Sequence, residues 1–233
     1  MDNAVLGNIE RQYAQRHATK IVVSDVEFFE MLELILSFKD KEITQHTKRT
    51  KRYAKIFLNK MIHEENYERV LIDMDCESIA NAMGIHDVGK IGICDDILFK
   101  PGRLTDEEFN EVKTHVDVGL NILDSILAGR KTESIAIKNC YDIIRCHHER
   151  WDGSGYPNGL KGAAIPLSAR IAAIADVYDA LTSKRPYKDA CAHTEAVRII
   201  TYGAGSHFDP DIVDCFLSAE QNFQLLLENP IKE

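Results

Sequence analysis

The sequence lacks any long hydrophobic run, and this absence bears first on membrane association. No apolar stretch approaches the roughly 18 residues that a membrane-spanning helix requires. The opening residues, MDNAVLGNIERQ, also lack the basic segment followed by an apolar one that marks a secretory signal peptide. We therefore expect a cytoplasmic protein that has no membrane partner.

An excess of positive charge is also lacking. The formal net charge is −9 at pH 7 over 233 residues. Polymeric nucleic acids and anionic membrane surfaces are bound mainly through basic surfaces, so neither is an expected partner. A small anionic substrate would have to be attracted locally, by metal ions and by a few basic side chains.

Cysteine pairs with metal-binding spacing are absent as well. None of the six cysteines forms a CxxC motif, which excludes the usual zinc-finger patterns. The chain is also too long for a small secreted scaffold held by disulfides, so we expect free thiols in a reducing compartment. Cys146 directly precedes a pair of histidines, but we interpret it as a small buried apolar residue rather than a metal ligand.

Strand-like alternation, internal repeats and low-complexity segments are missing, whereas helical patterns are frequent. The composition, with 45% hydrophobic and 28% charged residues, is that of an ordinary globular protein. A chain of this length can bury a substantial core in one domain. We predict a tail or linker over residues 1–22 and a single all-α domain over residues 23–233.

Local patterns predict where the helices lie. Ser24 and Glu27 have the spacing of a capping box, and Thr105 and Glu108 repeat it before a helix that ends near His115. The run ARIAAIADVYDALTS is apolar nearly all round and predicts a central, buried helix. The helix after Ser24 has an apolar stripe formed by Phe28, Phe29, Leu32, Ile35 and Leu36. A helix is expected over about 41–61, and another is expected to end near His86. Four more are expected over about 119–127, 133–146, 194–202 and 210–227, and a loop over 89–104.

The string HHERWDGSGYP carries the strongest chemical signal. It begins with His147 and His148, and its glycines and proline cannot continue a helix. Two neighbouring imidazoles at a helix end, beside a rigid loop that bears Tyr156, indicate a metal site with a substrate wall. Histidines that could converge with them are His46, His86 and His115. The remaining histidines, which we expect to face solvent or form local hydrogen bonds, are His17, His63, His193 and His207.

Three carboxylates complete this pattern. Asp87 follows His86 directly and could bridge two cations, because each carboxylate oxygen can bind one ion. Asp176 lies within the most apolar predicted helix, where it needs a metal ion or, alternatively, an arginine or N–H partner. Glu42 precedes His46 by one helical turn, although this spacing also fits a surface Glu–His pair. Imidazoles and carboxylates without thiolates suit iron, manganese or zinc.

The ordered series of motifs resembles a known family. HDVGKIGICDDILFKPGRLT, the spacing from His115 to Gly119, HHERWDGSGYP and ADVYDALTSKRPYK are similar to the HD-GYP subfamily of the HD metal-dependent phosphohydrolases. The resemblance covers about residues 25–220. It implies an HD-domain helical bundle with a buried multi-metal centre that hydrolyses cyclic di-GMP to pGpG, GMP or both. It also implies two or three divalent metal ions, with iron or manganese preferred.

The resemblance assigns roles to particular residues. It implies that one metal ion is held by His46, His86, Asp87 and Asp176, and a second by Asp87, His115, His147 and His148. Glu42 would bind a third ion. Asp87 and Lys90 would be catalytic, and the residues that bind substrate would be Lys90, Tyr156, Arg185 and Lys188. The sequence departs from the family pattern at Cys94, where proline is usual, and at Gln45, where glycine is usual.

Two other functions stay open at this stage. The chain could be a receptor that binds a cyclic dinucleotide without turnover, although a receptor does not need a complete set of metal ligands. It could instead hydrolyse another cyclic dinucleotide, such as cyclic GMP-AMP. A second copy of the chain, in a homodimer, or a separate regulatory protein is a further candidate partner.

Overall fold

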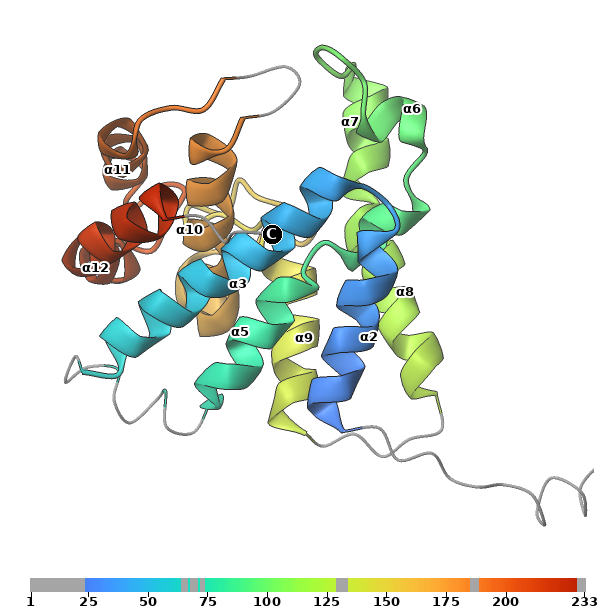
Figure 1. Cartoon of the computed structure of the whole chain (residues 1–233), viewed down its shortest axis with the longest axis horizontal. Coiled ribbons are helices and arrows are strands. Elements are labelled where there is room, and N and C mark those ends of the chain that lie inside the picture. The colour runs from blue at the N-terminus through green and yellow to red at the C-terminus, as the bar shows by residue number, and fades with distance from the viewer. Residues whose placement is uncertain are drawn as a thin grey trace, which may run out of the picture.

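The computed structural model describes residues 24–63, 67, 71, 74–128, 134–184 and 189–229. The described part contains helices and no β-strand, which confirms the predicted all-α class (Figure 1). The tail predicted over residues 1–22 lies outside the described residues, as do Arg185 and Lys188. None of the helices described combines the length and the apolar character needed to cross a membrane.

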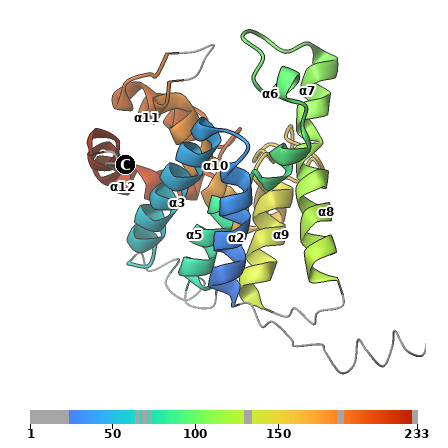
Figure 2. The ribbon, with the colours of Figure 1, turned by 45° about the vertical axis from the view of Figure 1, so that its right-hand side comes forward.

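A bundle of long helices forms the body of the molecule. Its members are α2 (Asp25–Ser37), α3 (Lys41–Met61), α5 (Cys76–Gly84), α8 (His115–Leu127), α9 (Ile135–Cys146) and α10 (Leu167–Thr182) (Figures 1 and 2). Two helices pack on the α3–α10 side, α11 (His193–Tyr202) and α12 (Pro210–Glu228). The connections carry the short helices η1 (Val88–Gly92), α6 (Asp95–Leu98), α7 (Asp106–Lys113) and η2 (Gly162–Ala164).

The predicted helix starts are confirmed by their capping interactions. The Glu27 amide donates to the Ser24 hydroxyl at 3.2 Å, and the Ser24 amide donates to the Glu27 carboxylate at 2.8 Å. Thr105 and Glu108 form the same reciprocal pair at the start of α7. Such caps satisfy amides that have no partner within the helix.

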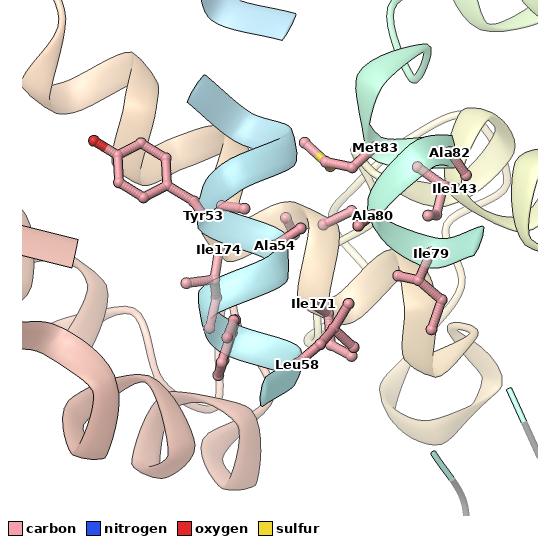
Figure 3. Packing of buried hydrophobic residues seen from close by; sticks show 14 of the residues in the cluster. Tyr53, Ala54, Leu58, Ile79, Ala80, Ala82, Met83, Ile143, Ile171 and Ile174 are labelled. Atoms are coloured by element: carbon pink, nitrogen blue, oxygen red, sulfur yellow. The ribbon is translucent and has the colours of Figure 1, made fainter. Parts of the chain in front are cut away.

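Small side chains allow the central helices to pack closely around the core. Ala54 of α3 and Ala80 of α5 are almost fully buried, and they lie among Ile143, Ile171 and Ile174 of α9 and α10 (Figure 3). The predictions for the cysteines are confirmed, since all six are free thiols and Cys146, at 3% exposed, is buried. Close packing of α3, α5, α9 and α10 brings residues of α3 and α10 next to the ends of α5 and α9.

The structure corrects three local predictions. Residues 89–104 are not one loop, because η1 extends into them and the single turn of α6 lies within them. Such short elements leave no hydrophobic period to detect. The helix predicted from Gly119 begins at His115, because Thr114 ends α7 and starts α8 without an intervening loop. Ile35, a member of the predicted apolar stripe of α2, is 44% exposed rather than part of the core.

His193 was also misjudged, since it is neither exposed nor bonded only to its sequence neighbours. Its side chain is buried, and Nδ1 lies 2.9 Å from the Tyr178 hydroxyl of α10. Its Nε2 lies 2.5 Å from a carboxylate oxygen of Glu220 on α12. The polar residues around His193 in the sequence concealed this role, because both partners come from distant helices.

Candidate metal centre and active site

The structure gathers seven of the predicted ligand residues into two adjoining groups. Within each group, donor atoms lie within 4.8 Å of one another. The first group contains His46, His86 and Asp176, and the second contains Asp87, His115, His147 and His148. All but Asp176 and His148 are buried, and those two are partly buried.

The ends of several helices supply these side chains. His86 and Asp87 follow α5, His115 opens α8, and His147 follows the last residue of α9. A side chain at Gly89 would clash with the backbone, because its Cβ would lie 1.8 Å from the His115 carbonyl oxygen. Glycine at this position therefore allows the turn after Asp87 to approach the start of α8.

Asp87 lies between the two groups and faces both. Its Oδ2 is 3.3 Å from Nε2 of His86 and 3.6 Å from Nε2 of His46. Its Oδ1 is 3.4 Å from Nε2 of His115 and 3.9 Å from Nε2 of His147. One carboxylate thus presents a different oxygen to each group, which is the arrangement that a bridging ligand requires.

Four of the histidines are oriented in the same way. Nδ1 donates to a main-chain carbonyl in three of them: to Met83 from His86 (2.7 Å), to Val112 from His115 (2.7 Å) and to Ile143 from His147 (2.9 Å). In His46, Nδ1 donates to Oδ2 of Asp179 at 2.7 Å. A carbonyl only accepts, so each Nδ1 carries the proton and each Nε2 faces the cluster. Histidine ligands of metal ions are held in this manner.

Burial keeps the imidazoles of the second group neutral. It lowers the pKa of His115, and together with the nearby imidazoles it lowers the pKa of His147 well below the usual range. Burial likewise lowers the pKa of His148, to about 3. Neutral imidazole is the form that binds metal ions, so these side chains are ready ligands at neutral pH.

Carboxylates dominate the electrostatics of the first group. Burial opposes a charge on His86, but Asp87 and Asp176 raise its pKa to about 10. Burial also opposes ionisation of Asp87, yet Lys90 and His86 hold its pKa well below the usual range. The pKa of Asp176 is lowered despite burial, through its hydrogen bond to His86. Two ionised carboxylates in a buried site require positive charge close by.

The donor set fits divalent cations. Oδ1 of Asp87 is buried and accepts no hydrogen bond from any described residue. Nε2 atoms also face one another, 3.3 Å apart in His46 and His86 and 3.4 Å apart in His115 and His147. Lone pairs held in this way repel unless a proton or a cation lies among them. The residues present therefore suit a centre of two ions, one in each group.

Lys90 and Tyr156 border the cluster. Nζ of Lys90 lies 2.5 Å from Oδ2 of Asp87. The Tyr156 ring stacks on the His148 ring, with 4.6 Å between centroids and 28° between planes. A side chain at Gly155 would come within 2.4 Å of the Arg150 amide, so only glycine allows the loop to fold this closely beneath Tyr156.

Glu42 lies outside both groups. Its side chain is 44% exposed, and its carboxylate accepts a hydrogen bond from the Arg49 guanidinium at 2.7 Å. Arg49 also binds Asp179, so it connects Glu42 to the residue that orients His46. The predicted contacts of Arg185 and Lys188 fall on residues that the structure does not describe.

Asp179 is a functional residue that the sequence interpretation missed. It is fully buried and binds both Nδ1 of His46 and Nε of Arg49, the latter at 2.5 Å. Hydrogen bonds from His46 and Arg49 lower the pKa of Asp179, although burial by itself would raise it. The available signal was a second carboxylate one turn after Asp176 in the same apolar helix.

Glu149 was missed as well, although it directly follows the two histidines. It is 2% exposed, and its two carboxylate oxygens accept from the amides of Asn158 (2.8 Å) and Leu160 (3.0 Å). It thus ties the chain after Tyr156 back to the end of α9. Its role is to position the loop, because its carboxylate is committed to these two amides.

We predict that Glu149→Gln destabilises the fold by about 1–3 kcal/mol, because glutamine replaces one of the two accepting carboxylate oxygens with an NH2 donor. Urea unfolding of the two proteins measures this difference. Glu195→Gln is the control, since Glu195 is 41% exposed and pairs with Arg198 on the surface. Equal stability of Glu149→Gln and the unsubstituted chain would contradict the assigned role.

An all-helical bundle with a buried histidine and aspartate cluster, whose Nε2 and carboxylate atoms converge, defines a class of metal-binding helical domains. The family model described as HD domain matches residues 30–212 of this chain. The chain therefore belongs to the HD domain family.

Curated relatives extend this assignment. A protein of Vibrio cholerae named cyclic di-GMP phosphodiesterase is 42% identical over 82% of this chain and 39% of its own length. One of Thermotoga maritima with the same name is 40% identical over 84% of this chain and 49% of its own length. These relatives and the family match confirm the resemblance to the HD-GYP subfamily. The chain spans less than half the length of these relatives.

Two further proteins similar to this chain are named for cyclic GMP-AMP. A Vibrio cholerae protein named 3′3′-cGAMP-specific phosphodiesterase 2 is 42% identical over 66% of this chain and 28% of its own length. The crystal structure of a cyclic GMP-AMP specific phosphodiesterase of V. cholerae matches 84% of this chain and 50% of that chain, with a TM-score of 0.51. Its sequence identity is 20%, so this likeness concerns the fold.

Proposed function

We propose that this chain is a metal-dependent phosphodiesterase that hydrolyses cyclic di-GMP to pGpG, GMP or both. The observation that carries the proposal is the common orientation of four histidines, each with Nδ1 bonded outward and Nε2 directed at Asp87 or Asp176. The names of the Vibrio and Thermotoga relatives support cyclic di-GMP as the substrate.

The two groups would each hold one divalent ion, with Asp87 shared between them and iron or manganese preferred. When bound, such ions supply an activated water at neutral pH and neutralise charge on phosphoryl oxygens. The sequence pattern and the donor set support this loading, because the ligands are nitrogen and oxygen atoms without thiolate.

The chain's own side chains would bind and orient the substrate. Lys90, beside Asp87, is placed to neutralise charge that develops on the phosphoryl oxygens. Tyr156, stacked on His148, forms one wall against a base or a phosphate. Arg185 and Lys188 are proposed to contact phosphate from the segment after α10, on the basis of their place in the RPYK motif.

Product chromatography tests the proposal. Protein purified without oxygen is stripped of metal with a chelator, reloaded with iron or manganese, and incubated with cyclic di-GMP. We expect pGpG or GMP from the reloaded protein and none from the stripped protein. Tight binding of cyclic di-GMP without any product, at full metal loading, would contradict the enzyme and favour the receptor function.

Cyclic GMP-AMP is the second candidate substrate, because one relative of 42% identity is named as specific for it. The same assay with both nucleotides at matched concentrations distinguishes the two. Under the proposed function, kcat/KM is higher for cyclic di-GMP than for cyclic GMP-AMP. The reverse order would reassign the substrate while leaving the metal centre in place.

Glu42 is proposed to hold a third ion and to promote the second cleavage, from pGpG to GMP. It lies one helical turn before His46, and an ion there would displace its contact with Arg49. Glu42→Ala is expected to lower the metal content and raise the ratio of pGpG to GMP, measured by elemental analysis and chromatography. Glu195→Ala, at a similarly exposed glutamate paired with an arginine, is the control. Unchanged metal content and product ratio would contradict the third site.

A further inference from the structure

A cavity of about 750 Å³ lies beside the metal centre, between η1, α6 and α7. Helices α6 and α7 project side by side from one edge of the bundle (Figures 1 and 2). The size is that of a site for a small organic ligand. Nothing in the roles assigned so far uses this space, apart from Lys90 in its wall.

Three contacts connect the cavity walls to the metal centre. Lys90 lines the cavity and pairs with Asp87. Val112 lines it too, and its carbonyl accepts from Nδ1 of His115 at 2.7 Å. The Phe109 ring, also in the wall, lies 6.4 Å from the Tyr156 ring in an edge-to-face arrangement. These contacts place the cavity walls next to the residues that border the metal centre.

The cavity combines apolar walls with charged side chains of both signs, since Asp106 lines it together with three basic residues. Ile97, Leu98, Leu104 and Phe109 contribute apolar surface. Of the two other basic side chains in the lining, Lys100 is paired with Glu108 at 2.7 and 2.8 Å. Arg103 is exposed and forms no hydrogen bond or ion pair with any described residue. Its guanidinium is thus free to bind an anion, and its planar fork matches a phosphate group.

Phe109 offers a stacking surface. Phe109 is 44% exposed, and its ring contacts the Lys113 ammonium and the Tyr156 ring. Nζ of Lys113 lies 4.6 Å from the Phe109 centroid and 5.5 Å from the Tyr156 centroid, so positive charge accompanies both rings. Exposed aromatic rings beside basic groups bind nucleobases by stacking.

We infer that this cavity binds the distal half of the cyclic dinucleotide. Phe109 stacks on the purine base of the second nucleotide, and Arg103 binds the phosphate that is not being cleaved. The inference rests on the proposed function, since it places the first phosphate at the metal centre. It assigns Arg103 and Phe109 a role in selecting cyclic dinucleotides over small phosphodiesters.

The test compares two substrates. One is cyclic di-GMP, and the other is bis(p-nitrophenyl) phosphate, a phosphodiester too small to reach both the metal centre and the cavity. The measured quantity is the ratio of kcat/KM for the two substrates, which is insensitive to the fraction of folded protein. Arg103→Ala and Phe109→Ala are each expected to lower this ratio about tenfold, mainly through a higher KM for cyclic di-GMP.

Conservative and remote variants complete the design. Phe109→Trp retains a stacking surface and is expected to restore most of the ratio. Arg198→Ala and Tyr202→Ala change an exposed arginine (69%) and an exposed aromatic residue (89%) on α11, outside the cavity, and are expected to leave the ratio unchanged. An unchanged ratio in both Arg103→Ala and Phe109→Ala would overturn the inference.

Failure of the proposed function would be visible separately. In that case the unsubstituted chain cleaves no cyclic di-GMP at full metal loading, whatever the cavity variants do. Calorimetric titration with cyclic di-GMP then tests the cavity by itself, and Arg103→Ala and Phe109→Ala are expected to raise Kd about tenfold. Equal Kd values for the variants and the unsubstituted chain would overturn the inference by this route as well.

Discussion

Replacing Asp87 with alanine is expected to abolish phosphodiester hydrolysis, with a fall in kcat of at least about 10²–10³-fold. The reason is that Oδ2 and Oδ1 of this one carboxylate face different histidine groups, so its loss removes a ligand from both proposed ions. Lys90 would also lose its partner. Chromatography of the products and elemental analysis of the purified protein measure the two effects.

Two variants make this experiment specific. Asp87→Asn keeps the shape of the side chain but removes its charge, and it should also lose metal and activity. Asp95→Ala is the control, since Asp95 is 68% exposed and, among the described residues, its ion pair is with Lys39, outside both metal groups. Hydrolysis of cyclic di-GMP at an undiminished rate by Asp87→Ala would refute a catalytic role for the metal centre.

Replacing Asp179 with asparagine is expected to lower metal affinity about 10–100-fold, although Asp179 belongs to neither metal group. Its carboxylate holds Nδ1 of His46 at 2.7 Å and therefore fixes which nitrogen of His46 faces the centre. The change also leaves Arg49 without its buried counterion, and breaking such a pair costs about 3–5 kcal/mol of stability. Metal titration and urea unfolding report the two effects independently.

Asp209 provides a matched control for Asp179. Its side chain is 2% exposed and pairs with Arg170 at 2.5 Å, so Asp209→Asn also breaks a buried aspartate–arginine pair. This variant should lose stability while its metal affinity is unchanged. If Asp179→Asn binds metal as tightly as Asp209→Asn does, then Asp179 serves only to stabilise the fold.

Much of the fold could be predicted from local sequence. The capping boxes at Ser24 and Thr105 and the apolar run of α10 located helices that the structure contains. Prediction failed where an element was too short to show a period, as in α6, or where a residue's partners are distant in sequence, as for His193. The hydrogen bonds within a helix and at its caps join residues close in sequence, whereas the burial of a side chain depends on how the helices pack.

For the candidate site too, local sequence predicted some features, and others depend on the tertiary structure. The sequence by itself determined the family, the helical class and the identity of the histidines and aspartates, because residue type and spacing carry their chemistry. Only the tertiary structure decided that Asp87 turns one oxygen to each group, that Asp179 orients His46, and that Glu42 pairs with Arg49. Those relations join side chains far apart in the chain, and their geometry follows from helix packing, which no local pattern encodes.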